Sequence, residues 1–175
     1  MLVHGAHHGG WCWDKVVPLL EQEGHTVLAP DLPGLGRDST PIEEISFDAY
    51  VKRISCVVAV QEEQVLLVGH SMAGGIITQV AEECAEEIAT LVYLCAFLPA
   101  NGESLLDWMR KDVDSLVPRY RVDSADGSQS TMLDEDVGQI FYADCLDEDV
   151  DRARALLRPQ ASAPLSVPVR TTARR

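Results

Sequence analysis

The segment from Gln64 to Gly75 has the residue types and spacing that nucleophilic chemistry requires. The apolar run Val65–Val68 is typical of a buried strand, and an apolar helical pattern opens directly after Ser71. A serine on the sharp turn between such elements holds its Oγ out of the sheet, and small residues at Gly69 and Ala73 let the two backbone arms approach closely. We therefore predict a nucleophilic serine rather than a simple helix-capping one.

A second stretch, near the start of the chain, offers groups that stabilise negative charge. An apolar strand ends in His4-Gly5, and further small residues follow it. Such a loop can aim the backbone N–H of Ala6 at the point where Ser71 attacks. Together with the N–H of Met72, the residue after the serine, it would form an oxyanion hole with two donors.

The distribution of histidines does not fit this chemistry. All five lie before Ser71: His4, His7, His8, His25 and His70. In proteins with a strand–turn–helix serine, the histidine base follows the serine in the chain. We predict that His70 packs beside the turn, that His4 orders the loop through a backbone hydrogen bond, and that His25 lies on the surface. Without an imidazole to take its proton, Ser71 is a weak nucleophile at neutral pH.

Two other groups of residues have side chains that could bind a ligand. His7, His8 and Cys12 could hold a metal ion, but the spacing H-H-x3-C fits no common zinc motif, so we predict loop packing and no metal. The three tryptophans leave two interpretations open. They could line an apolar acyl or aryl pocket, or they could be core residues and a lid contact. They are Trp11, Trp13 and Trp108.

Short β-type runs alternate with helical patterns over the first hundred residues. We predict strands at 2–3, 25–29, 65–68 and 88–97, and helices at 13–23, 46–60 and 72–83. This order is typical of an α/β fold with a doubly wound parallel sheet that helices cover on both faces. Right-handed crossovers then place Ser71 at the carboxyl edge of a central strand.

The pattern changes after Pro99. Acidic helices are predicted at 102–114 and 132–157, with a polar linker at 122–130 and no further strand. Helices inserted after a sheet strand suggest a helical lid over the site.

Composition excludes several classes of partner. The 175 residues carry 28 acidic and 14 basic side chains, and a formal net charge of −14 repels nucleic acid and anionic membrane surfaces. Five scattered cysteines without a C-x-x-C pair favour reduced thiols in a cytoplasmic protein. There is no signal peptide pattern and no apolar run of about 18 residues. We expect no nucleic-acid or membrane partner, and the oligomeric state stays open.

Together the motifs resemble the α/β-hydrolases, and in particular the branch of plant methylesterases, hydroxynitrile lyases and their bacterial relatives. The matching stretches are H-G-A-H-H-G-G-W-C-W at 4–13, G-H-T-V-L-A-P-D-L-P-G-L-G at 24–36, V-G-H-S-M-A-G-G at 68–75 and L-V-Y-L-C-A-F-L-P at 91–99. The resemblance implies Ser71 as the nucleophile, Ala6 and Met72 as oxyanion donors, and His8 as a residue lining the pocket. In the lyases a threonine usually stands where this sequence has Gly5, so Gly5 favours the esterase side.

The sequence departs from the family pattern at two points. Ala73 replaces the second glycine of G-x-S-x-G, and alanine still permits a tight turn. In the family an acid and a histidine follow later sheet strands, and neither strand is found here. We therefore expect a chain that is incomplete at both ends, with residues 1–99 as the N-terminal part of the hydrolase core, 100–160 as the lid, and 161–175 as a truncated return to the core.

The leading hypothesis is a serine hydrolase of the carboxylesterase type that acts on a small apolar or aromatic ester. Ser71 would attack, a base would come from beyond Arg175, and no metal or organic cofactor is implied. One alternative is a non-catalytic ligand-binding relative or inactive truncated fragment, which the lack of a histidine after Ser71 supports. The other is a hydroxynitrile lyase, which Gly5 disfavours.

Overall fold

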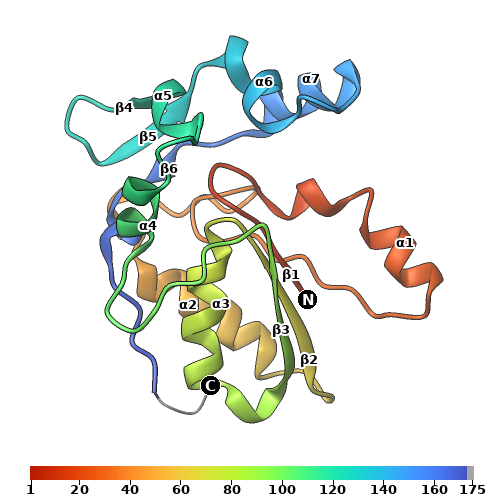
Figure 1. Cartoon of the computed structure of the whole chain (residues 1–175). Helices are drawn as coiled ribbons and strands as arrows, with labels where there is room; N and C mark the ends of the chain where they lie inside the picture. Colours follow the sequence, from red (N-terminus) through yellow and green to blue (C-terminus); the bar gives the residue numbers. More distant parts are fainter. Residues whose placement is uncertain (173–175) are drawn as a thin grey trace.

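The computed structural model describes residues 1–172 and centres on a parallel sheet. Its three strands lie in the order β1-β2-β3, all parallel, so that β2 is central (Figure 1). They are β1 (Leu2–Val3), β2 (Val65–His70) and β3 (Ile88–Leu94). Parallel strands bring their carboxyl ends to one edge, and Ser71 directly follows the central strand. The predicted α/β class and the position of Ser71 are confirmed.

Two helices cover one face of the sheet. α3 (Ala73–Glu83) packs against β2 and β3, and α2 (Phe47–Val58) packs beside α3. The predicted start of α2 is confirmed, because the Ser46 Oγ accepts the backbone N–H of Ala49 at 3.1 Å and caps the first turn. Buried side chains of both helices and the sheet form the core, among them Tyr50, Ile54, Val58, Leu67, Ile76, Ile77 and Val80.

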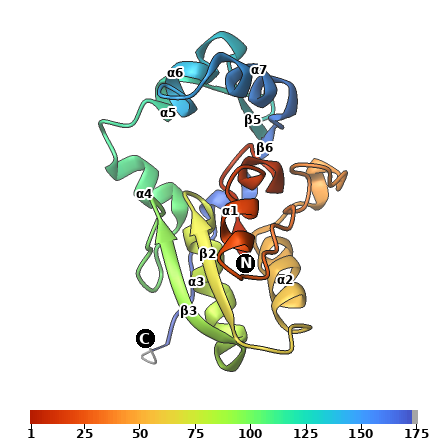
Figure 2. The same cartoon turned by 90° about the vertical axis from the view of Figure 1, so that its right-hand side faces the viewer.

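The opposite face of the sheet is largely open within residues 1–172, so the predicted covering of both faces by helices is found there only in part. Figure 2 looks onto this face, with β2 and β3 in front of α3. Leu66, Val92 and Leu94 are 50%, 41% and 44% exposed there. α1 (Val17–Gln22) lies on this side, but none of its residues is buried.

The N-terminal elements are shorter than predicted. Residues 25–29 form no strand, and a single backbone hydrogen bond within residues 1–172, from Leu2 N–H to Leu28 O at 2.8 Å, joins this segment to β1. The helix predicted at 13–23 is a 3-10 turn, η1 (Gly10–Trp13), followed by α1. Pro18 lies in the first turn of α1. Proline is tolerated there because the N–H groups of a first turn have no acceptor within the helix, whereas a residue further along must donate one.

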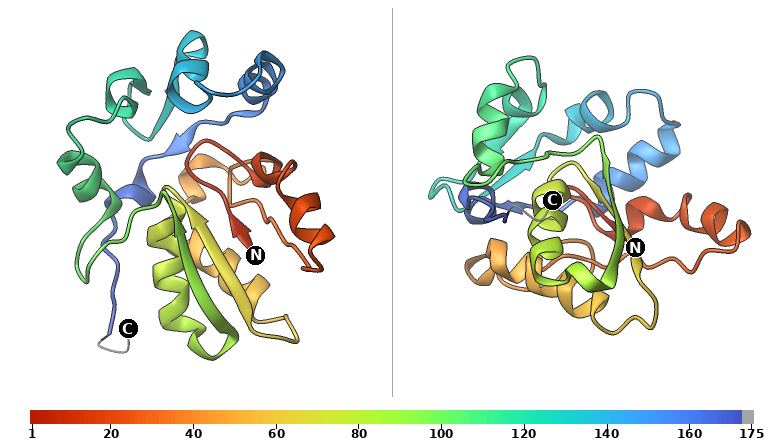
Figure 3. Two further views of the ribbon diagram at one scale, coloured as in Figure 1. Left: turned by 45° about the vertical axis from the view of Figure 1, so that its right-hand side comes forward. Right: turned by 60° about the horizontal axis from the view of Figure 1, so that its bottom comes forward.

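Residues 105–161 form a second layer above the carboxyl edge of the sheet (Figures 1 and 3). The helix predicted at 132–157 is broken into separate pieces, and the prediction of no strand after Phe97 is wrong, because a small antiparallel sheet of order β4-β5-β6 forms. In chain order the elements are α4 (Leu105–Lys111), α5 (Val117–Tyr120), β4 (Arg121–Asp123), β5 (Gln129–Met132), α6 (Val137–Phe141), α7 (Asp147–Leu156) and β6 (Gln160–Ala161).

Residues 122–130 were predicted to be a polar linker. They instead belong to a hairpin that β4, β5 and the turn between them form. Its turn carries Asp126 and Gly127, and Gly127 has a φ of +68°. The Asp126 carboxylate accepts the N–H and the hydroxyl of Ser128. An Asp-Gly pair is a strong hairpin signal, so the sequence contained the sign of this turn.

After β6 the chain runs back down beside α3 (Figure 3). Val169 is buried, Arg170 N–H donates to Gln79 Oε1 at 2.9 Å, and Thr172 N–H donates to Glu82 Oε2 at 3.0 Å. The remaining 3-10 turns are η2 (Ile42–Glu44), η3 (Ala85–Glu87), η4 (Asp134–Asp136) and η5 (Ala163–Ser166).

The structure also bears on redox state and membrane contact. All five cysteines are free thiols. Over residues 1–172, no helix combines the length and the hydropathy that crossing a bilayer requires.

Candidate active site

Ser71 lies on a strained turn between β2 and α3. Its φ is +53°, in the left-handed region that residues with a Cβ rarely adopt. The N–H groups of Gly74 and Phe97 donate to the Ser71 carbonyl at 3.0 and 3.2 Å and hold the turn. A Cβ on Gly69 would lie 3.0 Å from the carbonyl oxygen of Ala73, so glycine at 69 permits the close approach of strand and helix.

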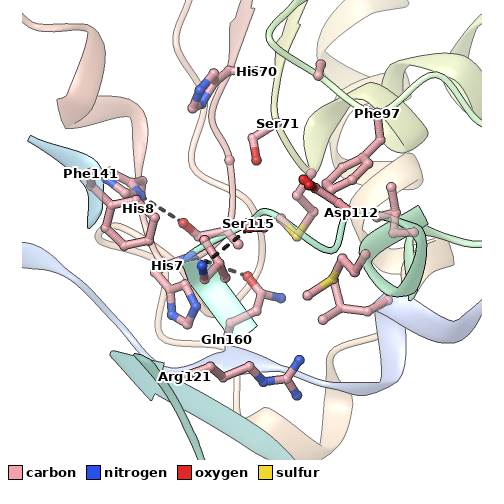
Figure 4. A pocket seen from close by; sticks show the side chains of 18 of the residues that line it. His7, His8, His70, Ser71, Phe97, Asp112, Ser115, Arg121, Phe141 and Gln160 are labelled. Carbon is pink, nitrogen blue, oxygen red and sulfur yellow. Dashed lines mark hydrogen bonds between the residues drawn. The ribbon is translucent and has the colours of Figure 1, made fainter. Parts of the chain in front are cut away.

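Ser71 lines a pocket of about 450 Å³ between the sheet edge and residues 105–161. Figure 4 shows its hydroxyl directed toward side chains across this space. Much of the wall is apolar: Met72, Phe97, Leu105, Met109, Phe141 and Leu165. Polar side chains stand among these, including His7, His8, His70, Asp112, Ser115, Arg121 and Gln160.

Two backbone N–H groups at this pocket are free to bind a ligand. Ala6 and Met72 both line it, and neither N–H donates to an acceptor in the hydrogen bonds found over residues 1–172. Met72 directly precedes α3, where the partial positive charge of the helix terminus lies. The pair can therefore stabilise a negative charge that develops on a bound molecule.

His4 orders the loop that carries Ala6, as predicted. Its Nδ1–H donates to the Gly5 carbonyl at 2.9 Å, and its Nε2 accepts the Leu32 N–H at 3.1 Å. Both ring nitrogens are therefore used by the neutral form. Burial lowers the pKa of His4 to about 4, since a charged imidazolium would lose its hydration there.

His8 lines the pocket, as the resemblance implies, and is also fully engaged. Its Nδ1–H donates to the Ala6 carbonyl at 2.8 Å, and its Nε2 accepts the hydroxyl of Tyr142 at 2.8 Å. Burial lowers the pKa of His8 to about 4. His7 donates from Nδ1 to the Arg158 carbonyl at 3.1 Å, and burial lowers its pKa too. Both imidazoles are thus neutral parts of the loop.

His70 adjoins Ser71 in sequence but does not contact its hydroxyl. Its ring meets the edge of Trp13, with 6.2 Å between ring centroids and 87° between planes, and Figure 4 shows it turned away from the Ser71 Oγ. Burial lowers the pKa of His70. Within residues 1–172, which include all five histidines, no imidazole is hydrogen bonded to the Ser71 Oγ.

The tryptophans pack rather than line the pocket, which settles the choice left open by the sequence. Trp11 stacks on His8 at 5.3 Å between centroids, and Trp13 is buried. The Trp108 Nε1–H donates to Glu103 Oε2 at 2.8 Å. Neither Trp11 nor Trp108 is among the lining residues.

Sequence reasoning missed several polar residues of the pocket, above all Arg121 and Gln160. Arg121 forms an ion pair with Asp123 at 2.7 Å, and Gln160 is buried. A lone arginine or glutamine belongs to no motif. The one local sign was Pro159, which disfavours helix at the residue before it and so indicates that the chain has left α7 before Gln160.

Comparison with known proteins shows which family this chain resembles. Residues 1–174 match the alpha/beta hydrolase family. The "Carbendazim hydrolyzing esterase" of Nocardioides sp. (strain SG-4G) is 35% identical over 176 residues, 97% of this chain and 72% of the relative. "Methylesterase 1" of Arabidopsis thaliana is 42% identical over 110 residues, 59% of this chain and 41% of the relative. A solved structure of a tomato Methylketone Synthase I variant, complexed with beta-ketoheptanoate, has a TM-score of 0.87 at 26% identity and covers 99% of this chain and 72% of its own.

Some curated relatives match more than nine-tenths of this chain. The chain spans between 63% and 72% of the length of those relatives. The predicted resemblance to methylesterases and bacterial esterases is confirmed. A serine turn at the carboxyl edge of a parallel sheet, and a family match over residues 1–174, lead to one conclusion: this chain belongs to the alpha/beta hydrolase family.

Proposed function

We propose that this chain carries the nucleophile and the oxyanion hole of a serine esterase. The observation that carries the proposal is the left-handed Ser71 turn, which presents its hydroxyl to a pocket that Ala6 and Met72 also line. Strain of this kind persists where the surrounding structure imposes it, and it concentrates at active sites.

In the proposed reaction the Ser71 Oγ attacks the carbonyl carbon of the ester and loses its proton to a base. The carbonyl oxygen becomes an oxyanion and accepts the N–H groups of Ala6 and Met72. The C–O bond to the alcohol then breaks, and the alcohol leaves with a proton from the same base. Water attacks the acyl-serine in turn, which releases the acid and restores the hydroxyl.

The base is proposed to come from outside the 175 residues. His4 and His8 use both ring nitrogens in other hydrogen bonds, His7 binds Arg158, and His70 faces Trp13. The greater length of the relatives supports this part of the proposal.

The pocket favours a small apolar or aromatic ester. Its volume of about 450 Å³ and its aromatic and thioether side chains suit a substrate of that size and polarity. The names of the two curated relatives, a carbendazim hydrolyzing esterase and a methylesterase, are consistent with small esters.

Two alternatives remain, each favoured or disfavoured by one feature. A ligand-binding relative without activity is favoured because no imidazole within residues 1–172 is hydrogen bonded to the Ser71 Oγ. Hydroxynitrile lyase chemistry is disfavoured by Gly5, because it offers no hydroxyl beside Ser71. A Cβ at residue 5 would lie 3.1 Å from the Ser71 Cβ, so a threonine there would also crowd the serine.

An organophosphonate probe tests the proposal, because it forms a stable bond to a serine only if that serine is activated. Because the base is proposed to lie after Arg175, the probe is applied to the polypeptide that includes the residues after Arg175. We expect labelling of Ser71 there, located by peptide mapping, no labelling in its Ser71→Ala variant, and much slower labelling of the 175-residue chain, which lacks the base. Ser166→Ala, which removes an exposed serine outside the pocket, should label as the wild type does.

Labelling of the longer polypeptide no greater than in its Ser71→Ala variant would contradict the proposed esterase activity. Binding of an aromatic carboxylic acid at the pocket, measured by chemical-shift changes, would then support the ligand-binding alternative. The coding sequence after Arg175 offers a second check: an in-frame aspartate and a late histidine support the proposed source of the base, and a stop codon contradicts it.

A further inference from the structure

His7 has a backbone conformation that residues with a Cβ rarely adopt. Its φ is +65°, in the left-handed region where a Cβ crowds the neighbouring carbonyl. It directly follows Ala6, whose N–H is the proposed oxyanion donor. Because histidine does not adopt this conformation by preference, other parts of the molecule must hold it.

Residues 158–160 supply the contacts that hold His7. The His7 N–H donates to Gln160 Oε1 at 3.4 Å, the Arg158 N–H donates to the His7 carbonyl at 2.9 Å, and the His7 Nδ1–H donates to the Arg158 carbonyl at 3.1 Å. The backbone donor, the backbone acceptor and the ring of His7 are therefore all bound to one short segment, more than 150 positions away in the sequence. Figure 4 shows Gln160 between the loop and Arg121.

Gln160 is itself fixed by the core and by the small sheet. Its side chain is 1% exposed, and its Nε2 donates to the Tyr50 hydroxyl and to the Ala161 carbonyl, each at 3.0 Å. Its backbone pairs with Ser130 on β5. With both N–H bonds of the amide directed to these acceptors, the Oε1 faces the His7 N–H without freedom to turn.

We infer that Gln160 is a positioning residue for the oxyanion hole. It holds the His7 peptide in its left-handed conformation and thereby sets the direction of the preceding Ala6 N–H. The inference rests on the proposed function, in which that N–H stabilises the oxyanion. Gln160 does not touch the reacting atoms; it couples the core residue Tyr50 and the β5–β6 pair to the loop.

The test compares a substitution at Gln160 with one at its partner Tyr50. Gln160→Met keeps the length of the side chain but removes the acceptor, and Tyr50→Phe removes a contact of Gln160 but leaves Oε1 in place. Each variant is made in the polypeptide that includes the residues after Arg175, and the phosphonate is used over a range of concentrations, which separates its affinity from the rate of Ser71 acylation. The thermal midpoint is measured alongside.

We expect Gln160→Met to slow acylation about 10- to 100-fold while probe affinity changes less than about twofold, because a misdirected donor weakens the transition state more than the ground state. Tyr50→Phe should stay within about threefold of the wild-type acylation rate. An unchanged rate in Gln160→Met, or equal losses of rate and thermal midpoint in Gln160→Met and Tyr50→Phe, would overturn the inference.

Amide hydrogen exchange tests the same contact without activity. The His7 N–H should exchange at least about tenfold faster in Gln160→Met than in the wild type, because it loses its acceptor. An unchanged exchange rate overturns the inference. A wild type that is not labelled above Ser71→Ala contradicts the proposed function instead, so the two failures are distinguishable.

Discussion

The turn at Ser71 and the loop from His4 to Gly10 meet in one pocket, but they are held in opposite ways. The turn is held by residues close in sequence, such as Gly74, and by Phe97 at the end of the next crossover. The loop is held by distant residues: Leu32, Tyr142, Arg158 and Gln160. The strained serine therefore depends mostly on its own short motif, whereas the loop from His4 to Gly10 depends on distant parts of the chain.

The largest expected effect is acid destabilisation of the loop through His4. An unfolded histidine titrates near 6.5, whereas burial lowers the pKa of His4 to about 4. The folded state therefore keeps its full stability above pH 6.5 and loses stability as the pH falls toward 4, by about 3 kcal/mol for this residue. Urea unfolding between pH 7 and pH 4 measures the loss.

The share of His4 is isolated by His4→Gln, which retains a donor and an acceptor but does not titrate. Below pH 6.5 the free energy of unfolding of His4→Gln should fall less steeply with pH than that of the wild type. The difference in slope should correspond to about one bound proton. His25→Gln, at an exposed position, should follow the wild-type curve. Equal slopes for His4→Gln and the wild type would show that remote anchoring of the loop is not sensitive to protonation.

The next effect tests the local packing of the serine turn. Gly69→Ala places a Cβ 2.9 Å from Ile77 Cδ1 and 3.0 Å from the Ala73 carbonyl oxygen, and such overpacking costs about 2 kcal/mol. We expect a lower thermal midpoint and slower labelling of Ser71.

The matched control is Gly138→Ala. Gly138 lies on the short helix α6, where alanine is favoured, and its added Cβ would meet only the Val150 methyls, the nearer at 3.3 Å. It should unfold close to the wild-type temperature. A wild-type midpoint and labelling rate in Gly69→Ala would mean that the turn tolerates a wider approach than its geometry indicates.

The smallest effect concerns one remote anchor of the loop. Tyr142→Phe removes the hydroxyl that donates to His8 Nε2, which we expect to cost about 1 kcal/mol. Because that bond stabilises the neutral imidazole, the pKa of His8 should rise, as an NMR titration of the ring would detect. Tyr120→Phe, in the same second layer, is the control, and an unmoved His8 pKa in Tyr142→Phe would contradict the bond.

The same contrast explains what the sequence could predict. Residues 64–83 contain within themselves the apolar strand, the small residues and the helix that place Ser71, so the turn and its position on the sheet were predicted. The role of His4 followed from its place at the end of a strand. Gln160 could not be found in this way, because its proposed role depends on a contact with His7 across 153 positions and no local pattern marks it.

The second layer was predicted least well, for a physical reason of the same kind. Its strands β5 and β6 are short and polar, and they exist because they pair with one another rather than because of apolar alternation. The interrupted helices α6 and α7 share one acidic stretch that reads as a single helix until tertiary packing divides it.

The open face of the sheet has a consequence for every measurement on this chain. Leu66, Val92 and Leu94 are apolar and exposed, and the outer edge of β3 pairs with no strand within residues 1–172. Copies of the chain can bury these side chains against one another, and self-association that favours the folded state obeys mass action. We therefore predict a thermal midpoint that rises with protein concentration, and variants are best compared at one concentration.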